Sequence, residues 1–208
     1  MTAPAIEFRA GPHTYHLAGR QIPHVTGVLE ALERFLGVDP AVLEWAAERG
    51  RHVHAACHYL DEGDLHEDSL DSEIRPYVDA YRQFLRDVRP RWTAIEQRVY
   101  CPVYQYAGTL DRVGTLMLPG AEGMAVVDLK TVSSLSPVTG LQLAAYDHAY
   151  RYTDRRRKPL ARYALQLRPD RTYKLKRYDE LTDLAVFISQ LTVTGWARRN
   201  NRTQEIPA

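Results

Sequence analysis

Cysteines are few and long apolar runs are absent, and each shortage excludes a class of protein. The 208 residues include only Cys57 and Cys101, too few for a disulfide framework or for a four-cysteine metal or iron–sulfur site. No stretch approaches the ~20 apolar residues that a transmembrane helix requires, and the N-terminal residues lack the apolar segment of a signal peptide. We therefore expect a soluble, cytoplasmic protein.

A large excess of one charge is also absent, although the charges are unevenly distributed. The 27 Lys and Arg residues nearly balance 26 Asp and Glu residues, for a net charge of +1. Residues 1–141 carry 13 basic and 19 acidic residues, whereas residues 142–208 carry 14 and 7. The basic C-terminal third can contact nucleic-acid phosphates, but a chance difference between solvated faces explains the asymmetry equally well.

The hydrophobic pattern changes from helical to strand-like spacing near the middle of the chain, which predicts an α+β fold. Turn signals predict a hairpin before residue 23, and Thr26 is the predicted N-cap of the first helix. The predicted helices are 26–36, ending at Gly37, then 39–60, 70–88, 139–150 and 179–199. The predicted strands are 95–103, 106–118 and 123–131 as an antiparallel meander, then 162–167 and 173–178 as a hairpin.

The length suits one substantial hydrophobic core, and the sequence contains no internal repeat or second boundary. We expect a single domain over residues 1–208. It divides into an N-terminal hairpin and helices (1–90), a strand-rich core (91–178) and a C-terminal helix (179–199).

Two acids and a lysine lie on neighbouring predicted strands. Asp128 and Lys130 are two residues apart, so on a strand they point to the same face, and Asp111 lies on the preceding strand. Carboxylates hold hard cations such as Mg²⁺ or Mn²⁺. A neighbouring ammonium can orient water and stabilise the charge that develops when a phosphodiester is hydrolysed.

Two predicted helices carry further candidates at one-turn spacing. Gln142 and Tyr146 share a helix face, and so do Gly50 and His54. A packing pair is the alternative interpretation of Gln142 and Tyr146. His58 lies one turn beyond His54, so that the two could also form a zinc pair.

Taken together, these motifs resemble the PD-(D/E)XK nuclease superfamily, in particular its RecB-like and phage-exonuclease branch. The matching segments are Gly50-x-x-x-His54, Gly108-Thr-Leu-Asp111, Asp128-Leu-Lys130 and Gln142-x-x-x-Tyr146. Gly-x-x-Asp replaces the literal Pro-Asp and is usual in the RecB-like branch. The motifs span about half of the chain. The resemblance implies a restriction-endonuclease-like αβββαβ core, a central mixed sheet flanked by helices, with an N-terminal hairpin and helices added.

The resemblance also implies a role for each motif residue. Asp111 and Asp128 would bind Mg²⁺ or Mn²⁺ with help from His54, and Lys130 would be the catalytic lysine. Gln142 and Tyr146 would lie along the active site. Glu96 resembles an additional acid that exonuclease-type members place beside the metal, and a solvent-facing strand glutamate is the alternative.

The resemblance implies a divalent-metal-dependent deoxyribonuclease. The form expected first is an exonuclease that acts on DNA ends in phage or bacterial recombination, repair or replication. The implied partner is DNA, with a single-strand annealing or recombination protein as a further candidate. A structure-selective or sequence-specific endonuclease, a non-catalytic DNA-binding module and a hydrolase of another phosphoester are the alternatives. Cleavage polarity, strand preference and oligomeric state stay open.

Overall fold

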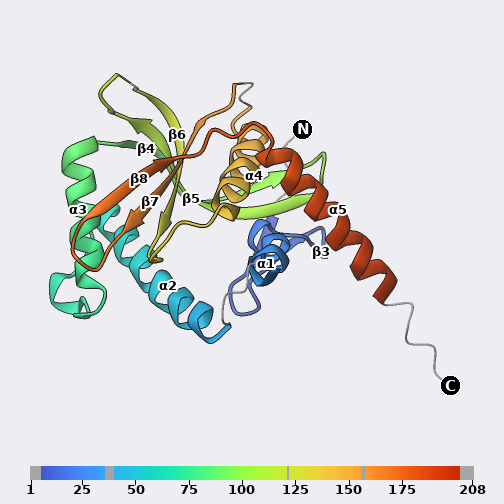
Figure 1. Ribbon diagram of the computed structural model, residues 1–208, viewed down its shortest axis with the longest axis horizontal. Coiled ribbons are helices and arrows are strands. Elements are labelled where there is room, and N and C mark those ends of the chain that lie inside the picture. The colour runs from blue at the N-terminus through green and yellow to red at the C-terminus, as the bar shows by residue number, and fades with distance from the viewer. Residues whose placement is uncertain (1–5, 36–39, 121, 156–157, 202–208) are drawn as a thin grey trace.

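The computed structural model describes residues 6–35, 40–120, 122–155 and 158–201. A five-stranded mixed sheet lies between two groups of helices, and a small N-terminal sheet packs at one end of it (Figure 1). The large sheet has the strand order β4-β5-β6-β7-β8. The α+β class and the αβββαβ core predicted from the sequence are therefore confirmed.

The connections of the large sheet explain its mixed character. β4 (Arg91–Cys101), β5 (Tyr106–Leu116) and β6 (Gly123–Lys130) form the predicted antiparallel meander. β7 (Ala161–Leu167) pairs parallel to β6, which requires a crossover, and helix α4 (Val138–Thr153) provides it. β8 (Tyr173–Arg177) is an edge strand, and its three basic residues suit the exposed edge.

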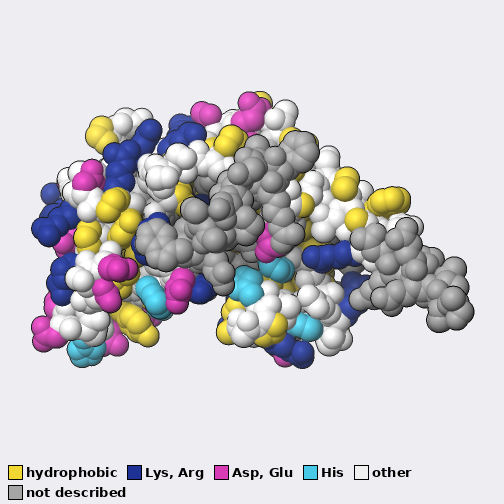
Figure 2. Space-filling view, turned by 60° about the horizontal axis from the view of Figure 1, so that its bottom comes forward, with side chains coloured by type: hydrophobic (Ala, Val, Ile, Leu, Met, Phe, Trp, Pro, Cys, Tyr) yellow, Lys and Arg dark blue, Asp and Glu magenta, His cyan; other side chains and the backbone are white. Residues whose placement is uncertain are grey.

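Helices cover both faces of the large sheet, which gives the molecule two apolar layers. α1 (Val25–Phe35), α4 and α5 (Asp183–Asn201) pack around one layer, and α2 (Pro40–Glu62) and α3 (Arg75–Val88) around the other. Of the helices in the described residues, none is both long and apolar enough to cross a membrane. Acidic and basic side chains are interspersed on the face shown in Figure 2, so the charge asymmetry of the sequence gives no one-signed surface there.

The N-terminal segment forms three strands where a hairpin was predicted. β1 (Ile6–Arg9), β2 (Thr14–Leu17) and β3 (Arg20–Ile22) pair antiparallel. Ala18 and Gly19 both have positive φ, 49° and 77°, which suits the two-residue turn of a second hairpin. The sheet buries Tyr15 and Ile22 against Ala107 of β5, so it is attached to the central strands.

Two helices begin later than the sequence predicted because local side-chain bonds compete with the helix. A 3₁₀ turn, η1 (Glu67–Ser69), precedes α3, and the Asp71 carboxylate accepts the Glu73 N–H at 2.7 Å before the helix starts. Before α5, the Glu180 carboxylate accepts the Thr182 N–H at 3.2 Å. The predicted helix boundaries at Gly37 and Asp39 lie outside the described residues.

The cap of α1 is His24, and the predicted cap, Thr26, lies inside the helix. The Gly27 N–H donates to His24 Nδ1 at 3.2 Å, and Thr26 Oγ1 lies 3.1 Å from the same nitrogen. A Cβ at Gly27 would lie 2.6 Å from His24 Nε2, so glycine makes room for the ring over the helix start. An imidazole can cap in this way only while Nδ1 is unprotonated.

We predict that His24 makes the protein less stable as the pH falls below about 6.5. Burial, with His13 and Arg198 nearby, lowers the pKa of His24 to about 4. Between these values the unfolded chain binds the proton more readily, so the free energy of unfolding should fall as the pH falls. Urea titrations from pH 7.5 to 4.5 should show a weaker pH dependence for His24→Asn, which retains a capping group. Parallel profiles for variant and wild type would contradict this.

Candidate active site

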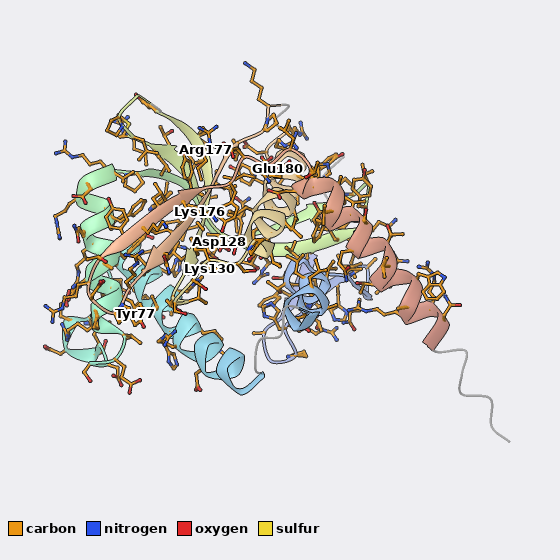
Figure 3. All side chains as sticks on the ribbon, viewed as in Figure 1. Tyr77, Asp128, Lys130, Lys176, Arg177 and Glu180 are labelled. Atoms are coloured by element: carbon orange, nitrogen blue, oxygen red, sulfur yellow. The ribbon has the colours of Figure 1, made fainter. Side chains whose placement is uncertain are left out.

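The sequence-predicted site residues all line one cavity of about 650 Å³. They come from three strands and two helices: His54 of α2, Glu96 of β4, Asp111 of β5, Asp128 and Lys130 of β6, and Gln142 and Tyr146 of α4. Figure 3 shows Asp128 and Lys130 close together on β6. The structure therefore brings the whole predicted set together, although the set spans 93 positions of sequence.

Strand register aligns the three acids in a row across the sheet. Arg112 pairs with Val127, which sets Asp111 opposite Asp128. On its other side, β5 pairs Arg112 with Ile95, which sets Asp111 opposite Glu96. Side chains at such opposed positions lie on the same face, so the three carboxylates are neighbours.

Glu96 has an unusual backbone conformation for a strand residue. Its φ is 46°, in the left-handed region, which costs a non-glycine residue roughly 1–3 kcal/mol and is concentrated at functional sites. The carboxylate accepts a bond from Arg112 Nη1 at 3.2 Å. The strained backbone and the arginine together direct Glu96 toward Asp111 and His54.

His54 is oriented by a backbone carbonyl. Its Nε2 lies 3.0 Å from the Leu129 carbonyl oxygen and must donate to it, so Nδ1 is directed to Asp111 Oδ1 at 3.5 Å. Atoms of His54, Glu96 and Asp111 lie within 4.8 Å of one another and could hold a metal ion. His58, the partner of His54 in the alternative zinc pair, is not in that group, and its Nε2 lies 3.5 Å from Glu62 Oε1.

The pKa values show how strongly these groups interact. Burial, reinforced by Asp111, raises the pKa of Glu96 to about 7, and burial raises that of Asp128 to about 6. Burial opposes ionisation of Asp111, but His54, Lys130 and the Leu129 N–H together outweigh it and lower the pKa to about 2. Burial likewise opposes protonation of His54, but Asp111 raises its pKa to about 9. Two buried acids and the half-buried Glu96 around one imidazolium form a site that favours a cation.

Lys130 and Asp128 are held by the helix that follows them. Lys130 Nζ lies 2.7 Å from Asp128 Oδ2 and donates to Gln142 Oε1 at 2.9 Å. The Gln142 amide in turn donates to Asp128 Oδ1 at 3.1 Å and to the Tyr146 hydroxyl at 3.4 Å. Gln142 thus contacts the acid, the lysine and the tyrosine, as one face of α4 allows.

Gly108 and Tyr146, which belong to two different motifs, meet in the structure. A Cβ at Gly108 would lie 2.6 Å from Tyr146 Cε1 and 3.2 Å from Val25 Cγ2. Side chains do not approach so closely, so only glycine at this position admits the tyrosine ring. This contact gives a physical reason for the glycine three residues before Asp111.

Arg112 was missed by the sequence reasoning. It is completely buried, and its Nε donates to Asp61 Oδ2 at 2.8 Å while Nη1 donates to the Asp111 carbonyl oxygen at 2.8 Å. The Tyr81 hydroxyl donates to the same Asp61 carboxylate at 2.8 Å. One guanidinium thus connects Glu96, the backbone of Asp111 and the helix that carries His54. An arginine directly after Asp111, in the middle of a strand whose other residues are uncharged, was the available signal.

Comparison with known proteins gives a likeness in fold alone. No family model matches the sequence, and no curated protein matches it. A protein of Eubacterium rectale described as a "putative exonuclease" has a TM-score of 0.51 and 14% identity, over 91% of this chain and 79% of that chain. An alkaline exonuclease from Laribacter hongkongensis has a TM-score of 0.38 and 9% identity, over 74% and 85%. Its complex with dAMP has a TM-score of 0.39 and 10% identity, over 88% and 94%.

We predict that Gly108→Ala destabilises the protein by about 1–3 kcal/mol, because the new methyl group must displace the buried Tyr146 ring. Gly123→Ala is the matched control, since a Cβ there meets nothing within 4 Å. Urea denaturation of both variants, and of Gly108→Ala combined with Tyr146→Ala, measures the effect. The two substitutions should be non-additive. Equal stability of the two single alanine variants would contradict the close approach.

We predict that Arg112→Met costs about 3–5 kcal/mol of stability, because it leaves the buried Asp61 carboxylate without its cation. Arg177→Met is the control. Its ion pair with Asp179 spans 3.8 Å between side chains 57% and 78% exposed, so its loss should cost less than about 1 kcal/mol. Denaturant midpoints of the two variants give the comparison. A similar small loss in both would show that the buried network contributes little.

Proposed function

We propose that this protein is a divalent-metal-dependent deoxyribonuclease, and specifically an exonuclease that hydrolyses DNA from its ends. The observation that carries the proposal is the meeting of three acids, a histidine and a lysine in one cavity. The motifs that resemble the RecB-like nucleases supply these residues in the expected order. The likeness in fold to the Eubacterium rectale protein, itself described as a "putative exonuclease", is consistent with it.

The donor set fits a hard divalent cation. Asp111, Glu96 and His54 would hold the ion, His54 as the neutral imidazole after losing its proton to solvent, and Asp128, buried beside Asp111, would contribute a further carboxylate. A site rich in carboxylate oxygen favours Mg²⁺ or Mn²⁺. When bound, such an ion neutralises phosphate charge and makes a water molecule more acidic.

Lys130 is the proposed catalytic residue. Its side chain is 23% exposed and lines the cavity, so the ammonium can contact both a water molecule and a phosphate oxygen. Hydrolysis joins the water oxygen to phosphorus and breaks the bond to the leaving oxygen on the opposite side. The fixed positive charge of Lys130 stabilises the negative charge that grows on the phosphate oxygens in this step.

Gln142 and Tyr146 position the lysine. The Gln142 carbonyl oxygen accepts from Lys130, and its amide group holds Asp128, so the amide fixes the distance between the two charges. Burial raises the pKa of Tyr146 well above its usual value, so the phenol stays protonated and can donate to a phosphate or base. Both residues act without changing their own charge.

The biological setting we infer is the cytoplasm of a bacterium or of a phage-infected cell, in DNA recombination, repair or replication. A single-strand annealing or recombination protein is the partner that such an exonuclease would serve. This setting rests on the resemblance of the sequence motifs and not on the geometry of the cavity.

We predict that Lys130→Ala lowers metal-dependent DNA digestion about a hundredfold or more, because the transition state loses its fixed cation. The assay is digestion of end-labelled linear duplex, single-stranded and closed circular DNA with Mg²⁺, Mn²⁺ or EDTA. Lys174→Ala, which removes an exposed lysine of β8, is the matched control and should digest DNA like the wild type. Circular dichroism of both variants checks the fold.

Each substrate separates one alternative from the proposal. Loss of linear DNA alone supports an exonuclease, and the label position then gives its polarity. Cleavage of closed circles at the same rate identifies an endonuclease. DNA binding without turnover under any metal condition, and indifferent to Lys130→Ala, identifies a binding module.

A further inference from the structure

One wall of the cavity lacks acidic side chains and is rich in aromatic rings, unlike the wall that carries the three acids. It is supplied by the N-terminal sheet and the start of α1, through His13, Tyr15 and Thr26. None of these three side chains is acidic. His13 occupies the turn between β1 and β2, and Tyr15 lies on β2. Histidine side chains also gather near the middle of the face shown in Figure 2.

The ring of His13 is held by three other rings. Its centroid lies 5.2 Å from Phe8, 5.3 Å from His24 and 6.0 Å from Tyr15, each in an edge-to-face arrangement. Such contacts fix the orientation of an aromatic ring. His13 itself is exposed, so the ring presents surface to the cavity while its neighbours support it.

The wall is bonded to the strand that carries the acids. The Tyr15 hydroxyl lies 2.8 Å from Thr109 Oγ1, and Thr109 is two residues before Asp111. The Tyr15 side chain is only 1% exposed, so this hydrogen bond is part of the packed interior. The position of the His13 ring is thus tied to that of the proposed metal ligands.

The backbone of His13 is strained. Its φ is 47°, a left-handed conformation that glycine or asparagine adopts more easily. Such strain costs roughly 1–3 kcal/mol and is concentrated at ligand-binding sites.

We propose that His13, supported by Phe8, Tyr15 and His24, is a stacking site for an unpaired nucleobase of the DNA strand being cut. The proposal rests on the function proposed above and adds the substrate class, which is a single-stranded or frayed end. Every base has a π face that an aromatic ring can stack against, so the site takes any sequence. The acids would bind the cation, and the wall of His13, Tyr15 and Thr26 would receive the base.

The size of the cavity favours a single strand. About 650 Å³ is the range of sites that enclose one small-molecule ligand. A base that enters such a space must leave its partner, and this costs a few kcal/mol in a duplex and least in single-stranded DNA. Cleavage of a blunt duplex end should therefore be slower than that of an unpaired end.

The test is equilibrium binding of a single-stranded oligonucleotide with 2-aminopurine at one end, whose fluorescence falls when the base stacks. Both end positions are used, in Mn²⁺, on protein carrying Lys130→Ala, so that cleavage is slow compared with the binding measurement. His13→Asn suits the backbone but removes the ring, whereas His13→Phe keeps a ring. Tyr104→Ala, which removes a 43% exposed aromatic outside the cavity, is the matched control.

We expect His13→Asn to weaken binding about tenfold or more and to remove the fluorescence quenching, since stacking of a base on an aromatic ring contributes substantially to binding affinity. His13→Phe should bind within about threefold of the parent, as should Tyr104→Ala. Unchanged binding by His13→Asn would overturn the proposal, and so would equal loss in the Asn and Phe variants.

Digestion by proteins with Lys130 intact separates this proposal from the function on which it rests. If the wild type cuts DNA but cuts blunt duplex ends as fast as single-stranded ends, the stacking site is wrong and the nuclease stands. If the wild type cuts no DNA while His13→Asn still loses single-strand binding, the nuclease is wrong and the nucleobase site stands.

Discussion

Mutual repulsion among three carboxylates on neighbouring strands is the constraint around which the central part of the structure is built. Strand register sets Glu96 and Asp128 on either side of Asp111, in a buried position where charge is costly. Cations reach this row from different elements: His54 from α2, Lys130 from β6 and Arg112 from β5. A bound divalent ion would reduce the repulsion that remains among the three carboxylates. The fold therefore places the acids where the metal site that we propose requires them.

Two helices are held in place by polar contacts with the carboxylates and their cations as well as by apolar packing. α2 carries both His54 and Asp61, two turns apart, so one helix contacts Asp111 and the arginine behind it. α4 carries Gln142 and Tyr146, whose approach depends on Gly108. A shift of α2 would separate His54 from Asp111 and Asp61 from Arg112, and a shift of α4 would remove Gln142 from Asp128 and Lys130. Stability and the proposed chemistry therefore depend on the same contacts.

The cavity joins two surfaces with different chemistry. Strands β4, β5 and β6 contribute carboxylates, and the N-terminal sheet contributes an aromatic wall bonded to β5 through Thr109. A nucleotide has the same division, with a charged phosphate and a flat apolar base. The N-terminal sheet is thus assigned a part in substrate binding and is not only an added structural element. Its Tyr15 and Ile22 also pack on β5, so the two roles share one interface.

The sequence by itself determined the features that depend on short-range periodicity. The two-residue spacing of Asp128 and Lys130, the four-residue spacing of Gln142 and Tyr146, and the meander followed by a crossover helix are all readable along the chain, because strand and helix geometry repeat locally. Only the tertiary structure decided the burial of Arg112, the φ of Glu96 and the packing of the His24 ring against His13. Each of these depends on side chains from separate elements meeting, or on a backbone conformation that its neighbours impose. No local spacing encodes such contacts.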